Sequence, residues 1–303
     1  FARMIISCGE ALVDIVDGSP LPGGGPMNAA IASARLGVPV AFGGALSTDE
    51  YGEMLYAHIE VNGVALNLIQ RTDAPTARAV VEHIPELQFT FEGDDTADMQ
   101  LSELDVAAVG SGPHILHGGT LAMFRGKTAE TLATLAEEHE GVVSLDPNIR
   151  PQILDHDPTL RTEWIGFHNR WLSNTDIYKG SDEDLAWIFP ELDPDEWVET
   201  LLAAGVSAVI ITRGADGLSV FTADGEVHAV SRRVDVVDTV GAGDTICGVV
   251  LASLWELRIT SKVAVRAMTL ADWTKIAEHA VEAAALTCSR PGADVPYRHE
   301  LTW

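Results

Sequence analysis

The chain has 303 residues, and its 45 acidic against 19 basic side chains give a formal net charge of −26 at pH 7. A nucleic-acid-binding protein needs a basic face that displaces counterions, and an anionic membrane surface repels an acidic protein, so this charge argues against both partners. It does not exclude a nucleotide, because backbone N–H groups can hold a small polyanion locally. With 47% hydrophobic residues, the chain can build the core of one large α/β domain.

The sequence also argues against secreted and membrane proteins. It contains no apolar run close to the roughly 20 residues of a membrane span, and no charged segment followed by the apolar core of a secretory signal. Its cysteines are Cys8, Cys247 and Cys288, an odd number without a CxxC pair. This favours a reducing compartment, so we expect a cytoplasmic protein with the cysteines buried as small hydrophobic residues.

Short apolar runs alternate with helical patterns along most of the chain. Residues 5–8 read as a first strand, and the apolar spacing that starts at Met27 predicts a helix that ends at Gly37. Further strands are predicted at residues 114–117, 142–145, 176–178 and 209–212, with helices between them such as 128–139 and 197–204. Alternating strands and helices favour a mostly parallel sheet covered on both faces, in a single domain that spans residues 1–303.

One segment departs from this alternation. Residues 78–84 and 88–91 read as strands joined around Pro85 with no helix between them, which predicts an antiparallel flap. A flap on an α/β body is a common form of lid. An edge hairpin without a function explains the same pattern equally well.

Two familiar nucleotide-binding motifs fail. The tripeptide that begins at Gly126 resembles the end of a phosphate loop, but Leu121 stands where that motif needs a glycine. The glycine pair Gly241 and Gly243 lacks the third glycine of a dinucleotide fingerprint, because Ile246 stands there. A dinucleotide-dependent dehydrogenase is therefore disfavoured.

The segment with the strongest chemical signal covers residues 238–245. We expect a strand at 233–237 before it and a helix after it, because apolar residues recur at helical spacing from Cys247. The glycines then lie at a helix N-terminus, where free N–H groups and the helix dipole make an anion site. Asp244 either accepts a proton from an attacking hydroxyl or simply caps the helix, and the spacing leaves both open.

A second glycine-rich segment lies near the start of the chain. Gly23, Gly24 and Gly25 precede a helix that carries Asn28, whose amide suits a polyol. Asp14, just after the first strand, could accept hydrogen bonds from two neighbouring hydroxyls. A flexible turn with ordinary surface residues is the alternative.

These motifs resemble the two signatures of the ribokinase/PfkB carbohydrate kinases, closest in pattern to fructokinases. The resemblance covers essentially the whole chain and rests on Gly24-Gly25…Asn28, Asp238 to Asp244, Gly9-Glu10…Asp14, Asp49 to Gly52, Asp146 to Arg150, Lys179 to Asp184, Thr212 to Gly217 and Ser289 to Ala293. It implies a three-layer ribokinase-like fold with a mostly parallel central sheet. It also implies a small β lid, formed from about 12–22 and 66–99.

The resemblance further implies an ATP-dependent sugar kinase and assigns its site residues. Asp244 would be the base, beside an anion hole of Gly241, Ala242 and Gly243, and Asp14, Gly24, Gly25 and Asn28 would hold the sugar. Ser181, Thr212, Gly214 and Gly217 would line the nucleotide. Asp184 would orient Mg²⁺ through water, and a monovalent cation such as K⁺ would be held by Asp238, Val240, Ser289 and Gly292. The implied partners are a sugar, ATP and a second copy of the chain through the lid.

The acceptor sugar is less sharply defined. Phe89 and Phe91, at the period of two of a strand, either face the sugar from the flap or pack the flap on the body. Arg150 either contacts a sugar hydroxyl or a carboxylate, or forms a structural ion pair. We expect fructose, converted to fructose 6-phosphate, ahead of 2-keto-3-deoxygluconate, and then ribose and nucleosides. A sugar-binding protein of the same fold without catalysis is the competing hypothesis.

Overall fold

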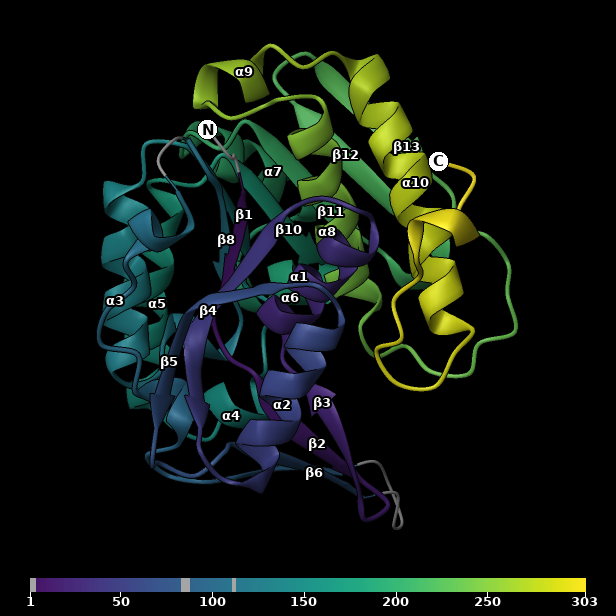
Figure 1. Ribbon diagram of the computed structural model, residues 1–303. Helices are drawn as coiled ribbons and strands as arrows, with labels where there is room; N and C mark the ends of the chain where they lie inside the picture. Colours follow the sequence, from purple (N-terminus) through teal and green to yellow (C-terminus); the bar gives the residue numbers. More distant parts are fainter. Residues whose placement is uncertain (1–3, 83–87, 111–112) are drawn as a thin grey trace.

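The computed structural model describes residues 4–82, 88–110 and 113–303. Within these residues, a large sheet of nine strands forms the centre of the molecule (Figure 1). Its strands, from edge to edge, are β13 (Gly225–Ala229), β12 (Leu218–Thr222), β11 (Ala208–Thr212), β10 (Ile177–Ser181), β9 (Val142–Asp146), β8 (Ile115–Gly119), β1 (Ile5–Cys8), β4 (Val40–Ser47) and β5 (Ala65–Thr72). The strands from β11 to β5 run parallel, and β12 and β13 are antiparallel at one edge.

Helices cover both faces of this sheet, because the strands of a parallel sheet are apolar on both faces and must be shielded from water on each. One face carries α1 (Gly25–Arg35), α2 (Glu50–Val61), α8 (Ala242–Glu256), α9 (Lys262–Arg266) and α10 (Leu270–Cys288). The other carries α3 (Gly126–Glu138), α4 (Pro151–Leu154), α5 (Pro158–Leu172), α6 (Asp182–Ile188) and α7 (Pro194–Ala203). Within the described ranges, no helix has the length and apolar character to cross a bilayer.

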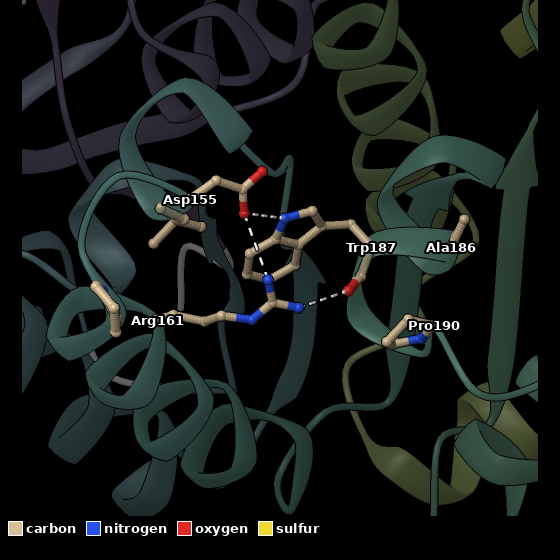
Figure 2. Close-up of a pocket in the computed structure, with 7 residues that line it drawn as sticks. Asp155, Arg161, Ala186, Trp187 and Pro190 are labelled. Carbon is tan, nitrogen blue, oxygen red and sulfur yellow. Dashed lines mark hydrogen bonds and ion pairs between the residues drawn. The ribbon is translucent and has the colours of Figure 1, made fainter.

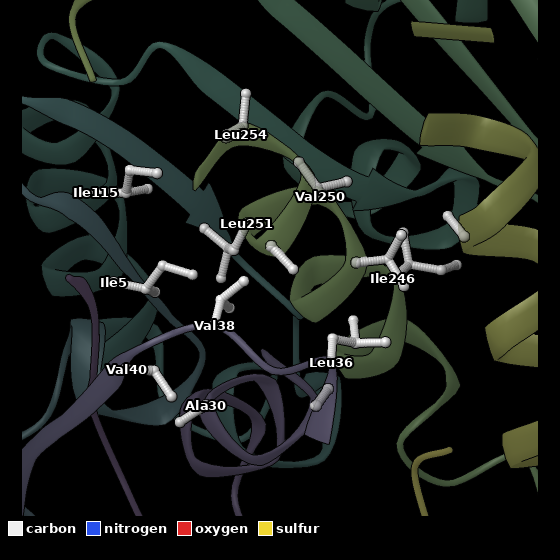
Figure 3. Close-up of a cluster of buried hydrophobic side chains, with 14 of the residues drawn as sticks. Ile5, Ala30, Leu36, Val38, Val40, Ile115, Ile246, Val250, Leu251 and Leu254 are labelled. Carbon is white, nitrogen blue, oxygen red and sulfur yellow. The ribbon is translucent and has the colours of Figure 1, made fainter. Parts of the chain in front are cut away.

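A separate apolar core lies on each face of the sheet. Figure 3 shows part of the first, where Ile5 and Val40 from neighbouring strands meet Ala30 of α1 and Leu251 of α8. The contact between α1 and α8 matters for function because it joins the two glycine-rich segments. Gly248 of α8 makes this close approach possible, since a Cβ on it would lie 2.3 Å from the Cβ of Ala32.

A small four-stranded sheet extends from one end of the large sheet (Figure 1). Its order is β3 (Ser19–Gly23), β2 (Leu12–Val16), β6 (Arg78–Glu82) and β7 (Gln88–Glu92). β6 and β7 pair antiparallel, as the flap pattern predicts, although the turn around Pro85 lies outside the described residues. Of the segment 66–99, β5 belongs to the large sheet and only β6 and β7 belong to the small one.

The three-layer α/β architecture and the mostly parallel sheet are confirmed, but the strand predicted at 233–237 is wrong. This segment pairs with no strand in the described part of the chain. β13 is the edge strand and ends at Ala229, so the chain leaves the sheet before these residues. Val236 and Val237 are therefore exposed, and the N–H of Val237 donates to the carbonyl of Cys288 in α10.

The strand order places a ligand site at one end of the sheet. β1 lies between β8 and β4, so the strands that follow it in sequence are added first on one side of β1 and then on the other. In open α/β sheets, ligands bind beyond the carboxyl ends of the strands at such a switch point. The residues that follow β1, β8 and β9 are Glu10, Thr120 and Asn148, and all three contribute to the site.

Candidate active site

The N-terminus of α8 presents backbone groups that can bind an anion. The helix begins after Gly241, which has φ 78° and supplies no capping side chain, so the first N–H groups are left without helix partners. The glycine is also needed for space, because a Cβ there would lie 2.6 Å from the Cβ of Ala293. The N–H of Ala242 donates to the carbonyl of Thr239 at 3.3 Å. The other N–H groups of this turn and the positive end of the helix dipole favour a bound anion.

Asp244 lies in the first turn of this helix and is buried. Its Oδ2 accepts a hydrogen bond of 2.8 Å from Nδ2 of Asn28, which joins α8 to α1. Burial and the charge of Asp146 raise the pKa of this carboxyl, whereas the Asn28 hydrogen bond, Lys179 and Arg150 act to lower it. A carboxyl group held in place with a raised pKa has the properties of a general base.

The second carboxylate oxygen of Asp244 faces the backbone of Gly25. A Cβ on Gly25 would lie 3.3 Å from Asp244 Oδ1, 2.8 Å from Thr120 Oγ1 and 3.2 Å from Asn148 Nδ2. Polar groups from α1, α8 and the ends of β8 and β9 therefore converge on this glycine. A side chain there would displace them, so glycine keeps the space next to Asp244 open.

Sequence reasoning missed Thr120 and gave Asn148 no role of its own. Both have a left-handed backbone, with φ of 56° for Thr120 and 40° for Asn148. This conformation is a genuine outlier for a β-branched threonine, and such strain is typical of functional sites. No sequence pattern marks Thr120, whereas Asn148 belongs to the Asp146 to Arg150 motif.

Neighbouring groups hold Thr120 in its strained conformation. Its N–H donates to the carbonyl of Asp146 at 3.1 Å, and Oε2 of the buried Glu10 accepts from the N–H of Ala122 at 3.0 Å. Burial raises the pKa of Glu10 to about 8. Its Oε1 has no hydrogen-bond partner in the described structure.

Arg150 and Asp14 complete this side of the site. Nη1 of Arg150 donates to Asn148 Oδ1 at 2.6 Å and to two neighbouring carbonyls. Burial raises the pKa of Asp14 to about 6 against the lowering charge of Arg150, and Asp244 and Asp238 raise it further. The fold thus brings Asp14, Asn28, Arg150 and Asp244 together, beside Gly24 and Gly25.

The flap aromatics are less directly connected to the site. Phe91 is partly buried and packs against the second core cluster. The side chain of Phe89 lies outside the described part of the structure. Contact of either ring with a sugar stays a prediction.

A cavity of about 820 Å³ opens on the other side of the first turn of α8. Thr212, Gly214 and Gly217 line it from the end of β11, and Ala242 and Gly243 line it from α8. Sequence reasoning missed its remaining walls, which include Arg232, Arg233, Val281, Ala284 and Ala285. Small apolar residues on a helix look like ordinary core in the sequence, so no signal marked those of α10.

Two predicted nucleotide and metal residues form a helix cap. Ser181 Oγ accepts from the N–H of Asp184, and Asp184 Oδ2 accepts from the N–H of Ser181 at 2.9 Å. Asp184 Oδ1 accepts from the N–H of Ile149 at 2.8 Å. Because both carboxylate oxygens accept backbone hydrogen bonds, a link from Asp184 to Mg²⁺ through water stays a prediction.

The loop expected to bind a monovalent cation is held together by Asp238. Its Oδ1 accepts from the N–H of Val240 at 3.0 Å, and its Oδ2 accepts from the N–H of Gly292 at 2.9 Å. Ser289 follows the end of α10 beside this loop. In the described part of the chain, no three His, Cys, Asp or Glu side chains gather as metal ligands.

A second hollow, of about 530 Å³, lies between α4, α5 and α6 (Figure 2). Its polar groups already have partners: Asp155 Oδ1 accepts from Trp187 Nε1 at 2.8 Å and from Arg161 Nη1 at 3.4 Å. The Arg161 guanidinium also stacks over the Trp187 ring. These internal contacts explain the hollow without a ligand.

Comparisons with known proteins show the family to which the chain is similar. The family model described as pfkB family carbohydrate kinase matches residues 10–300. A fructokinase of Rhizobium leguminosarum bv. trifolii is 35% identical over 263 residues, which cover 83% of this chain and 79% of that protein.

Solved structures extend the likeness to three dimensions. The structure of fructokinase with bound ATP from Xylella fastidiosa matches with a TM-score of 0.87 and 26% identity, covering 97% of this chain and 94% of that one. Aminoimidazole riboside kinase from Salmonella enterica, complexed with aminoimidazole riboside and an ATP analog, matches with a TM-score of 0.80 and 25% identity, covering 98% of each chain.

The fold is the expected ribokinase-like one, and its small sheet is the β lid. This fold and the family model define a carbohydrate kinase. The chain belongs to the pfkB family, as its motifs indicated.

Proposed function

We propose that this protein is an ATP-dependent kinase that transfers the γ-phosphoryl group of ATP to the 6-hydroxyl of fructose. The observation that carries the proposal is the position of Asp244. On one side, its free oxygen faces the polar groups around Gly25. On the other, Ala242 and Gly243 of the same helical turn line the 820 Å³ cavity, so this one turn carries both the base and part of the cavity wall.

The chemistry follows from this arrangement. Asp244 accepts the proton of the sugar hydroxyl while the oxygen of that hydroxyl forms a bond to the γ-phosphorus of ATP. At the same time, the bond between the γ-phosphorus and the bridging oxygen breaks, and ADP leaves with that oxygen. The N–H groups at Gly241, Ala242 and Gly243 stabilise the charge on the transferring group. Mg²⁺, which Asp184 would orient through water, would neutralise further charge on the phosphates.

The choice of fructose rests on the relatives. The Rhizobium leguminosarum bv. trifolii protein, 35% identical, is named a fructokinase, and so is a Zea mays protein that is 32% identical over 273 residues. Thr120, Asn148 and Asp14 offer the neutral and anionic groups that recognise sugar hydroxyls. Arg150 keeps 2-keto-3-deoxygluconate as the second candidate, because its guanidinium could pair with a carboxylate.

A panel of substrates tests the proposal. ADP release is measured with fructose, 2-keto-3-deoxygluconate, ribose and nucleosides, in the presence of Mg²⁺ and K⁺. We expect the highest kcat/KM with fructose. Asp244→Asn should retain sugar binding and lose at least about two orders of magnitude in kcat, whereas the exposed control Asp224→Asn should keep the wild-type rate.

Two outcomes would overturn parts of this proposal. Near-normal turnover by Asp244→Asn would remove the base assignment. Sugar binding without ADP release across the panel would favour a non-catalytic sugar-binding protein of the same fold.

The cation and the lid belong to the same proposal. The loop of Asp238, Val240, Ser289 and Gly292 would hold K⁺, so replacing K⁺ by tetramethylammonium should lower kcat. The small sheet would close over the sugar and pair with a second copy of the chain. Sedimentation measurements would detect that dimer, and an unchanged rate without K⁺ would remove the cation assignment.

A further inference from the structure

A lysine and an aspartate form a buried ion pair beneath the proposed active site. Nζ of Lys179, in the middle of β10, lies 2.8 Å from Oδ2 of Asp146, at the end of the neighbouring strand β9. The two residues are only 5% and 4% exposed. Lysine is almost never buried unless it is paired, and burying both charges costs free energy that apolar side chains would not. The pair is therefore weak evidence for added fold stability.

The ammonium group lies against the anion site. A Cβ on Gly243 would meet Lys179 Nζ at 2.8 Å, with Lys179 Cε next at 3.8 Å. Gly243 has no left-handed backbone, so here glycine serves to leave room for the ammonium. The positive charge of Lys179 is thus directly behind the N–H groups that would hold the transferring phosphoryl group.

Other contacts fix the pair in this position. The thiol of Cys247, one turn further along α8, donates to Asp146 Oδ2 at 3.4 Å. Asp146 Oδ1 has no partner within the described residues. Asp146 therefore contacts α8 through Cys247 and β10 through Lys179. It holds the lysine under the first turn of α8.

The charges around Asp244 explain why a positive group is needed there. Asp14 of β2 and Asp146 of β9 face it with negative charge. Against these stand Arg150 and Lys179. In a chain of net charge −26, the general field also opposes an incoming polyphosphate.

We propose that Lys179, held by Asp146, is a positioning residue that supplies a fixed positive charge beneath the anion hole and so stabilises the phosphoryl group during transfer. This inference rests on the proposed kinase function. A preorganised charge in a water-excluded site acts most strongly where charge develops, because it needs no reorganisation during the reaction. Lys179 should therefore affect the rate more than the binding of either substrate.

The test compares the wild type with Lys179→Met and with the double variant Lys179→Met/Asp146→Asn. The single change leaves Asp146 buried without its partner and is expected to destabilise the fold. The double change removes both charges and so leaves no unpaired ion in the core, which is what makes the single change costly. The exposed Lys275→Met on α10 controls for the loss of one positive charge.

We expect the double variant to unfold within a few degrees of the wild type and to lose at least about tenfold in kcat. Its KM for the sugar and its affinity for ADP should change less than about threefold. Its affinity for ADP with aluminium fluoride, which imitates the phosphoryl group in transfer, should fall in proportion to kcat. Lys275→Met should match the wild type in every measurement.

Wild-type kcat in the folded double variant would overturn the proposal. So would an equal loss of ADP and ADP–aluminium fluoride affinity, because that result indicates a distorted site and not a missing charge. Binding of ADP with aluminium fluoride needs no knowledge of the sugar. If the wild type phosphorylated none of the sugars, this measurement would still decide the role of Lys179 separately.

Discussion

Thr120 shows at the residue scale how strain and site geometry coincide. Its φ of 56° and ψ of −141° fall in a region that is accessible mainly to glycine. We expect Thr120→Gly to be more stable than Thr120→Ala by about 1–3 kcal/mol, because alanine keeps the backbone strain and glycine removes it. Urea unfolding of the two variants measures this difference.

The same pair of variants separates strain from chemistry. Both remove the hydroxyl that lies near Gly25, so both should raise the KM for the sugar. Thr120→Val, which keeps the shape and loses the hydroxyl, should show the same rise without a gain in stability. Equal stabilities for the glycine and alanine variants would contradict the strain argument.

Glu10 predicts a pH dependence of stability. Its pKa is raised by burial to about 8 in the folded protein, from an ordinary value of 4.5. A raised pKa means that its contribution to stability is fully present below pH 4.5 and is lost as the pH rises towards 8. The loss amounts to about 1.4 kcal/mol for each pKa unit of the shift.

Glu10→Gln should abolish this part of the pH dependence. The difference in unfolding free energy between the variant and the wild type should therefore grow in favour of the variant from pH 5 to pH 8. The exposed control Glu140→Gln should leave the profile unchanged. Parallel profiles for Glu10→Gln and the wild type would show that Glu10 is ionised in the fold.

At the scale of elements, Asp49 explains how α2 is connected to the small sheet. Its carboxylate accepts from the N–H of Gly52 at 2.7 Å, as the cap of α2, and from the N–H and hydroxyl of Thr76, just before β6. Gly52 is required because a Cβ there would collide with the carbonyl of Ser47. The motif from Asp49 to Gly52 thus has a structural reason that its sequence alone did not reveal.

We expect Asp49→Ala to lower the unfolding free energy by about 1–2 kcal/mol at pH 7. Burial acts to raise the pKa of Asp49, but the hydrogen bonds from Thr76 and Gly52 hold it below its usual value. A lowered pKa gives stability that is present above the unfolded-state pKa and lost as the pH falls through the folded one. The cost of the substitution should therefore shrink below pH 4, measured by urea unfolding against the exposed control Glu60→Ala.

At the scale of the whole molecule, the charge of −26 acts on stability and on nucleotide binding together. Self-repulsion destabilises an acidic fold, and the same field opposes ATP. Raising NaCl from 0.05 to 0.5 M at constant K⁺ shortens the screening length about threefold. The melting temperature should rise and the KM for ATP should fall, and flat values of both would show that the charge is too dispersed to matter.

The sequence by itself determined the alternation of strands and helices, the two glycine-rich segments and the family. These signals are local, because apolar periodicity and turn residues depend on neighbours along the chain. The prediction of a strand at 233–237 was wrong because it too used only local signals. A β-prone run forms a strand only where another strand is available to pair with it.

Only the tertiary structure decided what surrounds Asp244. Thr120, Asn148 and Glu10 follow three different strands. Because the sheet is parallel there, the carboxyl ends of these strands lie at the same edge, and the three residues come close together. Lys179 reads in the sequence as one of a few lysines in an acidic chain, yet the fold buries it against Gly243 and pairs it with Asp146, which is 33 residues away along the chain. Burial and pairing depend on contacts between distant segments, so no local pattern could assign the charge beneath the anion hole.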